Sequence, residues 1–110
     1  MTGIDIYKRA IGSLGYSDDN IFKDKAVIGI NQVYDDICGC IKVLEYKPIK
    51  TLGDAINLPD KVITSVMVYG LAEKLALGEG DGELQQYFAL KYDRAKMRLN
   101  QPDVVCDTLP

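Results

Sequence analysis

The chain has 110 residues, of which 47% are hydrophobic and 26% charged, with a formal net charge of -3 and a pI near 4.8. This length and composition predict one water-soluble globular domain, residues 1–110, whose core needs neither metals nor disulfides. A membrane span is not expected, because no apolar run approaches the roughly 20 residues that one requires, and the acidic balance argues against tight binding of nucleic-acid phosphates.

The N-terminus and the cysteines indicate where the chain works. Met1 to Asp5 includes neither the basic nor the apolar region of a signal peptide, so the chain is expected to stay in the cytoplasm that made it. Its three cysteines, Cys38, Cys40 and Cys106, are an odd number for a disulfide framework and are expected to be reduced.

Helical spacing of apolar residues predicts an all-α fold, a small bundle of about four helices. The first helix is expected within residues 1–15, with Thr2 as N-cap, Asp5 completing a capping box and Gly15 ending it. Its apolar face comprises Ile4, Tyr7, Ala10, Ile11 and Leu14.

The second helix is predicted over residues 17–44, where one face is apolar and the other polar. The apolar face comprises Ala26, Val27, Ile30, Val33, Tyr34, Ile37, Cys40, Ile41 and Leu44. The polar face comprises Lys25, Asn31, Gln32, Asp35, Asp36 and Lys42. Cys40 lies on the apolar stripe with Cys38 beside it, while Gly29 and Gly39 indicate close helix approach or simple tolerance.

An extended connection is predicted over residues 45–58, because prolines, glycines and polar residues interrupt the helical pattern there. A connection this long is unusual inside a small bundle. It predicts either a functional loop or a segment that packs against another subunit.

The third helix, residues 59–77, is apolar around most of its circumference and is expected to be central, with Pro59 at its first position. Glycines between Gly78 and Gly82 predict a turn into a fourth helix, residues 81–99. Residues 100–110 have no helical period and are expected to form a flexible C-terminal tail, apolar enough at Val104 and Val105 to dock on something.

Candidate chemical groups are few, and the chain has no histidine to act as general base. The spacing of Cys38 and Cys40 is not that of zinc or thioredoxin motifs. Three alternating acids, Glu79, Asp81 and Glu83, lack the ligand sequence of an EF-hand. The pairs Asp18-Asp19 and Asp35-Asp36 point about 100° apart on a helix. No catalytic, cofactor-binding or metal-binding residue is therefore assigned, and no enzyme is expected, although a small enzyme or metal protein stays an alternative.

The fourth helix carries both basic and aromatic residues. Lys91, Arg94, Lys96 and Arg98 suit the negative end of its dipole. Tyr87, Phe88 and Tyr92 beside them could stack the bases of single strands, but aromatic residues at helical spacing are typically core or interface residues. Core packing is the simplest assignment for Tyr69 and Tyr87, with direct contact between subunits as the alternative.

Two stretches, Leu58 to Leu77 and Gly80 to Phe88 with Tyr92, resemble the C-terminal helical hairpin of tailed-bacteriophage head-to-tail connector proteins, also called adaptor or head-completion proteins. In that family Leu-Pro opens an apolar helix containing Tyr-Gly-Leu-Ala. A short turn follows, and the next helix carries aromatic residues before basic ones.

The resemblance implies a structural protein of a phage or prophage. It implies a homo-oligomeric, dodecameric ring under the portal protein, formed from subunits that can be monomeric in isolation. The ring would extend the DNA channel without binding DNA specifically and would offer a platform for the stopper or tail-completion protein. Its place would be the head-tail junction of the virion, after assembly in the host bacterial cytoplasm.

Neighbouring subunits would then order residues 45–58 and 100–110, which a monomer would leave loose. The alternative function is a small helical nucleic-acid-binding or regulatory module of phage or bacterial origin, which would use the basic end of the fourth helix.

Overall fold

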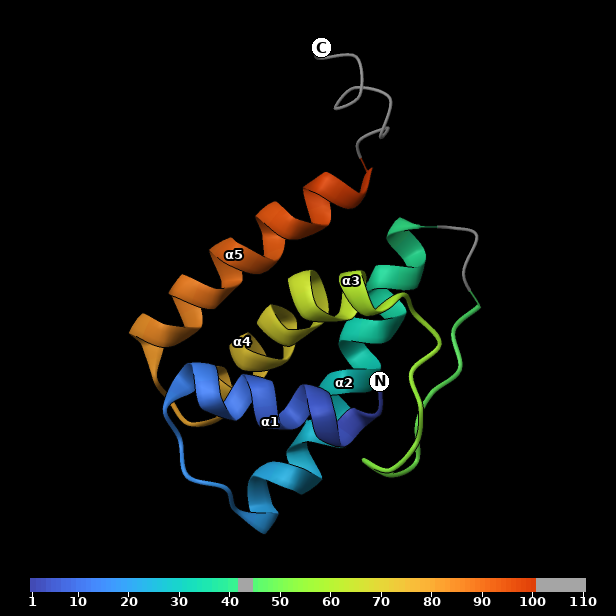
Figure 1. Cartoon of the computed structure of the whole chain (residues 1–110). Coiled ribbons are helices and arrows are strands. Elements are labelled where there is room, and N and C mark those ends of the chain that lie inside the picture. Colours follow the sequence, from blue (N-terminus) through green and yellow to red (C-terminus); the bar gives the residue numbers. More distant parts are fainter. Residues whose placement is uncertain (42–44, 101–110) are drawn as a thin grey trace.

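A computed structural model describes residues 1–41 and 45–100 of the chain. It confirms the all-α fold, since the described residues form helices with no strand among them (Figure 1). The elements are α1 (Gly3–Leu14), α2 (Asn20–Cys40), α3 (Asp60–Val62), the π-helical turn η1 (Ile63–Met67), α4 (Val68–Gly78) and α5 (Gly82–Asn100). The predicted tail lies outside the described residues, except that Asn100 is the last residue of α5.

Helix α1 begins and ends as its sequence predicts. The Asp5 carboxylate accepts from the backbone N–H of Thr2 over 3.1 Å, and the Thr2 side chain accepts from the backbone N–H of Asp5, which together form the capping box. At the other end Gly15 takes a left-handed conformation with φ of 73°, and its N–H bonds the carbonyls of Ile11 and Gly12. A residue with a side chain would be strained at this φ, so glycine fits the helix end.

Helix α2 buries the expected face but is shorter than predicted. It begins after the N-cap Asp19, whose carboxylate accepts from the N–H of Ile21 over 2.6 Å, and it ends at Cys40; residues 42–44 lie outside the described residues. The placement of the two cysteines was wrong, because Cys38 is buried and Cys40 only half-buried. Cys38 lies four residues after the fully buried Tyr34 and shares its side of the helix.

The predicted third helix is built from α3, η1 and α4, which follow one another without a break. Pro59 is the N-cap, not the first helical residue as predicted, because its ψ of 141° is extended. In η1 the N–H of Val68 bonds the carbonyl of Ile63, five residues back instead of four. The segment is central, as expected, and contacts α1, α2 and α5 (Figure 1).

Gly70 allows α2 and α5 to approach this central segment. A Cβ at Gly70 would lie 2.8 Å from the Tyr92 ring and 2.9 Å from the Val33 methyl groups. Gly29 plays the same part on α2, where a Cβ would lie 2.9 Å from Leu71, whereas Gly39 has open space around it. Close approach therefore explains Gly29 and Gly70, and simple tolerance explains Gly39.

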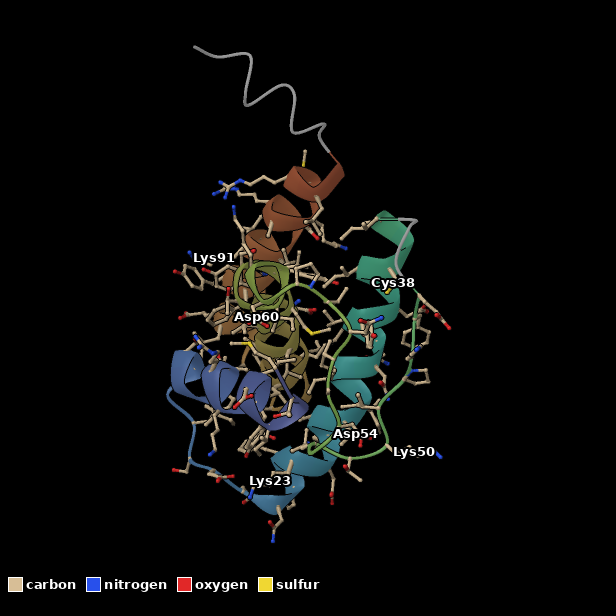
Figure 2. The ribbon with its side chains drawn as sticks, turned by 45° about the vertical axis from the view of Figure 1, so that its right-hand side comes forward. Lys23, Cys38, Lys50, Asp54, Asp60 and Lys91 are labelled. Atoms are coloured by element: carbon tan, nitrogen blue, oxygen red, sulfur yellow. The ribbon has the colours of Figure 1, made fainter. Side chains whose placement is uncertain are left out.

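The connection over residues 45–58 packs on its own chain, so the prediction that a monomer leaves it loose was wrong. Ile49, Ile56 and Leu58 are buried in the core. The amide of Asn31 donates to the carbonyl of Ile49 and accepts from its N–H, at 2.9 and 2.8 Å. Backbone bonds also join residues 52–56 to the first four residues of the chain. The segment runs beside α2, with Lys50 and Asp54 near its turn (Figure 2).

Candidate functional site

The acidic residues considered as metal or catalytic groups bond to their own chain. Asp81 accepts from the Tyr16 hydroxyl over 3.2 Å and from the N–H of Leu84 over 3.3 Å, so it caps α5. Glu79 pairs with Lys25 at 3.6 Å, and Glu83 is an exposed residue in the first turn of α5. Within residues 1–41 and 45–100, no three potential metal-ligating side chains gather in one place. The contacts of Asp81 and Glu79 therefore stabilise the turn between α4 and α5.

Each adjacent pair of aspartates is divided between two tasks. Asp18 accepts from the Tyr7 hydroxyl at 2.6 Å, and this hydrogen bond holds the pKa of Asp18 below its usual value. Asp19 instead caps α2. The two carboxylates therefore make separate structural contacts and are not arranged to act together on one substrate atom.

The second pair divides in the same way. Asp36 accepts from the Tyr92 hydroxyl at 2.6 Å and from Lys96 at 2.7 Å, while Asp35 is exposed. Burial opposes ionisation of Asp36, but the bonds from Lys96 and Tyr92 outweigh it, so the pKa of Asp36 lies below its usual value. Burial, and then the bond to Asp36, raise the pKa of Tyr92 far above its usual value. Asp36 thus joins α2 to α5, although its side chain remains 45% exposed on the polar face of α2.

Burial makes Cys38 an unreactive thiol. Cys38 and Cys40 are both free thiols, and burial raises the pKa of Cys38, which disfavours the nucleophilic thiolate. Cys106 lies outside the described residues. Cys38 acts as a small apolar residue of the core.

The most distinct surface feature is a groove between η1 and the C-terminal half of α5, here called the basic groove. Its main part has a volume of about 400 Å³, and a smaller part of about 160 Å³ continues it along α5. The lining residues are Lys61, Val62, Ser65, Val66, Tyr69, Lys91, Arg94, Ala95, Arg98 and Leu99. None of them is acidic, although the chain as a whole is.

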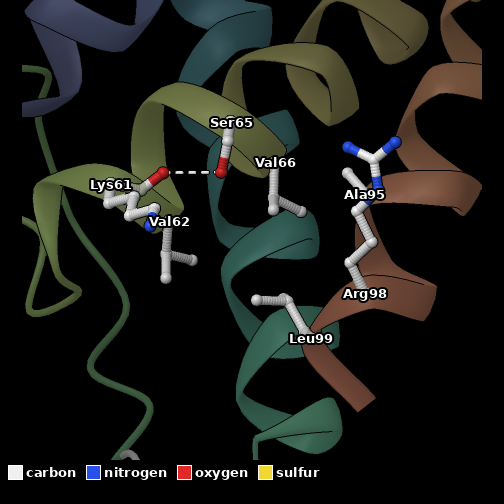
Figure 3. A pocket seen from close by; sticks show the side chains of 7 residues that line it. All are labelled: Lys61, Val62, Ser65, Val66, Ala95, Arg98 and Leu99. Carbon is white, nitrogen blue, oxygen red and sulfur yellow. Dashed lines mark hydrogen bonds between the residues drawn. The ribbon is translucent and has the colours of Figure 1, made fainter. Parts of the chain in front are cut away.

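The basic groove has an apolar floor and a cationic rim. Val62 of α3, Val66 of η1 and Leu99 of α5 point toward one another across the gap, and Arg98 stands beside them (Figure 3). No ion pair within residues 1–41 and 45–100 involves Lys61, Lys91, Arg94 or Arg98. The groove therefore presents unneutralised positive charge beside an apolar surface, which suits a ligand with both carboxylate and aliphatic groups.

The π turn forms one wall of the basic groove. The Ser65 hydroxyl donates to the carbonyl of Lys61 over 2.6 Å (Figure 3). The Thr64 hydroxyl donates to the carbonyl of Asp60 over 3.0 Å. These hydroxyls satisfy carbonyls at the start of a segment whose backbone bonding has shifted from four residues to five. Adjacent Thr64 and Ser65 were the only sign of this wall in the sequence.

The aromatic residues near the basic groove divide into buried and exposed ones. Phe88 and Tyr92 are buried, so they cannot stack bases, whereas Tyr87 is 53% exposed and the prediction that it packs in the core was wrong. The ammonium of Lys91 lies 5.4 Å from the centre of the Tyr69 ring and 5.1 Å from that of Tyr87. Lys91 is thereby held on the side of α5 away from α2 (Figure 2).

The sequence did not reveal the basic groove. Lys91, Arg94 and Arg98 lie at steps of three and four, which predicts a common face of α5, but they were interpreted as partners of the helix dipole. Lys61, at the other side of the groove, is distant in sequence. Only the packing of η1 against α5 brings these groups together.

A second surface carries exposed apolar side chains, here called the outer apolar surface. Leu77, Leu90 and Met97 are 59%, 58% and 62% exposed. Leu90 and Met97 lie seven residues apart, which places them on the same side of α5. Leu77 and Leu90 each border shallow hollows that Gln85 also lines. Burial of these large aliphatic groups against a partner lowers the free energy and so favours association.

The chain matches no protein-family model, no curated protein and no solved structure. Among the helices of the described residues, none combines the length and the apolar character that crossing a membrane requires.

Proposed function

We propose that the chain is a structural subunit that assembles with copies of itself, as a head-to-tail connector of a phage or prophage. The subunits form a ring beneath the portal protein, extend the DNA channel and bind a stopper or tail-completion protein. The ring belongs to the head-tail junction of the virion and is assembled in the host cytoplasm. Residues carry this role by contact between subunits and not by catalysis.

The observation that carries the proposal is the outer apolar surface. Three large aliphatic side chains, Leu77, Leu90 and Met97, remain more than half exposed although the core holds Leu71 and Leu75 almost completely buried. Exposure of such groups in water is unfavourable, and contact with a second subunit relieves it. A neighbouring copy in a ring is the partner that the proposal assigns to this surface.

The form of the C-terminal hairpin also supports the proposal. Residues that carry the family resemblance lie in one continuous unit, with Pro59 before the first helical turn and Tyr69 to Ala72 in α4. The turn at Gly80 has φ of 72° and leads into α5, where Phe88 and Tyr92 pack inward. The glycine turn and the inward aromatic residues thus have defined structural roles in the hairpin.

Electron microscopy of the purified chain mixed with its cognate portal protein tests the proposal. Added ring density at the channel exit is expected. Leu90→Glu combined with Met97→Glu should abolish that density without loss of helical circular dichroism, because charges cannot be buried at an apolar interface. Gln32→Glu, at an exposed position of α2, is the matched control and should leave the ring intact. Failure of the unaltered chain to join the portal would refute the proposal.

The basic groove favours the second candidate, a nucleic-acid-binding or regulatory module. Four cations without carboxylate partners in the described part of the chain suit phosphate contacts. Retention on DNA that falls steeply with salt would support this function, because released counterions drive such binding. A connector binds free DNA weakly, so retention near physiological salt separates the two candidates.

A further inference from the structure

The basic groove is an open binding surface with two chemical requirements. Its rim, with Lys61, Arg94 and Arg98, requires negative charge. Its floor, with Val62 and Leu99, requires aliphatic groups that exclude water. A bare phosphate backbone meets the first requirement and leaves the second unmet, so the combination favours an acidic peptide with aliphatic side chains.

We propose that the basic groove is the docking site of residues 101–110 of the same chain. This segment reads Gln-Pro-Asp-Val-Val-Cys-Asp-Thr-Leu-Pro and carries two aspartates and no basic residue. Val104 and Val105 supply the aliphatic groups for the floor. Asp103 and Asp107 supply carboxylates for Arg98 and Arg94, for which charge-assisted hydrogen bonds are the strongest available contacts.

The course of α5 brings the segment to the groove. Leu99, which lines the groove, precedes the last residue of α5, so residue 101 starts at the groove's end. Pro102 has no N–H to continue the helix and favours a change of direction. A chain that turns back there spans up to about 13 Å between residues 103 and 107. Arg94 and Arg98 stand about 6 Å apart along α5, so both aspartates can reach them.

Covalent connection strengthens this docking. Because the segment and the groove belong to one molecule, the local concentration of the segment is in the millimolar range whatever the protein concentration. Docking of this kind does not depend on ring formation. It describes the isolated chain, and it remains testable if the proposed connector function fails.

Cys106 provides the measurement, because it lies between Val105 and Asp107. The full-length reduced chain is treated with iodoacetamide under native conditions, and alkylation of each cysteine is followed by mass spectrometry of its peptides. A synthetic peptide of residues 101–110 gives the rate for an undocked thiol. Cys106 in the folded chain is expected to react roughly tenfold more slowly, which corresponds to a docking equilibrium constant of about ten.

Charge reversal identifies the groove as the site of protection. Arg94→Glu with Arg98→Glu should raise the Cys106 rate to that of the peptide, and Asp103→Lys with Asp107→Lys, compared with its own peptide, should do the same. Combining the four changes should restore protection. Lys8→Glu with Arg9→Glu, two exposed basic positions of α1, is the matched control and should leave the rate low.

Three results would overturn the proposal. Cys106 could react at the peptide rate in the unaltered chain. Its protection could rise with protein concentration, which would assign the groove to a segment from a second copy. Lastly, fluorescent single-stranded DNA could bind through Arg94 and Arg98 while Cys106 stays fully reactive, which would assign the groove to nucleic acid.

Discussion

Helix α5 has two sides with different polar contacts. On the side that faces α2, Tyr92 and Lys96 both donate to the Asp36 carboxylate. On the side that lines the basic groove, Arg94 and Arg98 have no carboxylate partner in the described part of the chain. The two sides therefore differ in how their charges are neutralised and in how closely they are packed. On the α2 side Tyr92 and Lys96 are paired with Asp36, and Gly70 leaves no room for a Cβ. On the groove side positive charge is left over, which costs little at the surface and remains available for a ligand.

Overpacking the tight side should have the largest effect. Gly70→Val places side-chain atoms where the Tyr92 ring and the Val33 methyl groups now lie, within 2.9 Å of a Cβ. Neither α2 nor α5 can move away without breaking the contacts around Asp36, so the free energy of unfolding should fall by roughly 2–3 kcal/mol. Urea denaturation followed by circular dichroism measures this loss.

A matched control for this substitution is Gly39→Ala on α2, where a Cβ meets nothing within 4 Å. Replacing this glycine in the last turn of α2 should raise the free energy of unfolding by less than the roughly 1 kcal/mol that applies in a helix interior. Equal destabilisation by both changes would show that close approach at Gly70 is not what limits the packing of α5.

Removal of the charge that joins α2 to α5 should have the next largest effect. Asp36→Asn weakens the bonds from Tyr92 and Lys96, so the free energy of unfolding should fall by about 1.5 kcal/mol, near the low end for hydrogen bonds to a charged group because Asp36 is 45% exposed. Asp35→Asn, next to it and exposed, should change stability by less than about 0.5 kcal/mol. If the two variants lose equal stability, the bonds to Asp36 do not hold α5.

The stabilisation from Asp36 should also depend on pH. The pKa of Asp36 in the folded chain lies below its unfolded value of about 3.9. Its contribution is therefore fully present above pH 4 and is lost as the pH falls through the folded pKa. The difference in unfolding free energy between the unaltered chain and Asp36→Asn, measured from pH 7 down to pH 2, should be constant at first and then shrink.

Comparing the difference, and not the stability of one chain, isolates Asp36, because Asp18 and Asp54 also have lowered pKa values in the folded chain. A difference that stays constant down to pH 2 would mean that the carboxylate charge of Asp36 contributes nothing. A difference that grows on acidification would contradict the direction of its pKa shift.

Local signals in the sequence predicted the helices, while long-range contacts decided the surfaces. Thr2 and Gly15 carry their capping chemistry within a few residues, so the ends of α1 could be predicted. Asn31 and Asp36 look like solvated residues because their partners, Ile49 and Tyr92, are 18 and 56 positions away.

The same reasoning explains why the connection and the basic groove were not foreseen. Burial of Ile49 depends on where α2 presents Asn31, and the groove depends on how η1 lies against α5. Breaker residues show that a segment is not helical, but they do not show whether it packs on its own chain. Whether a charged side chain on a helix finds a partner likewise depends on the positions of all neighbouring elements, which the sequence does not give.

Loss of the lysine on the groove side should have the smallest effect. Lys91 lies over the rings of Tyr69 and Tyr87 but is only half-buried, and a cation near an exposed ring contributes about 0.5–1 kcal/mol. Lys91→Gln should therefore lower the free energy of unfolding by about 0.5 kcal/mol. Lys96→Gln, one turn further along α5 on the α2 side, should cost more, because Lys96 donates to Asp36 over 2.7 Å. A double-mutant cycle of Lys91→Gln with Tyr87→Leu measures the contact with the Tyr87 ring directly, and a coupling near zero would show that this ring does not hold Lys91.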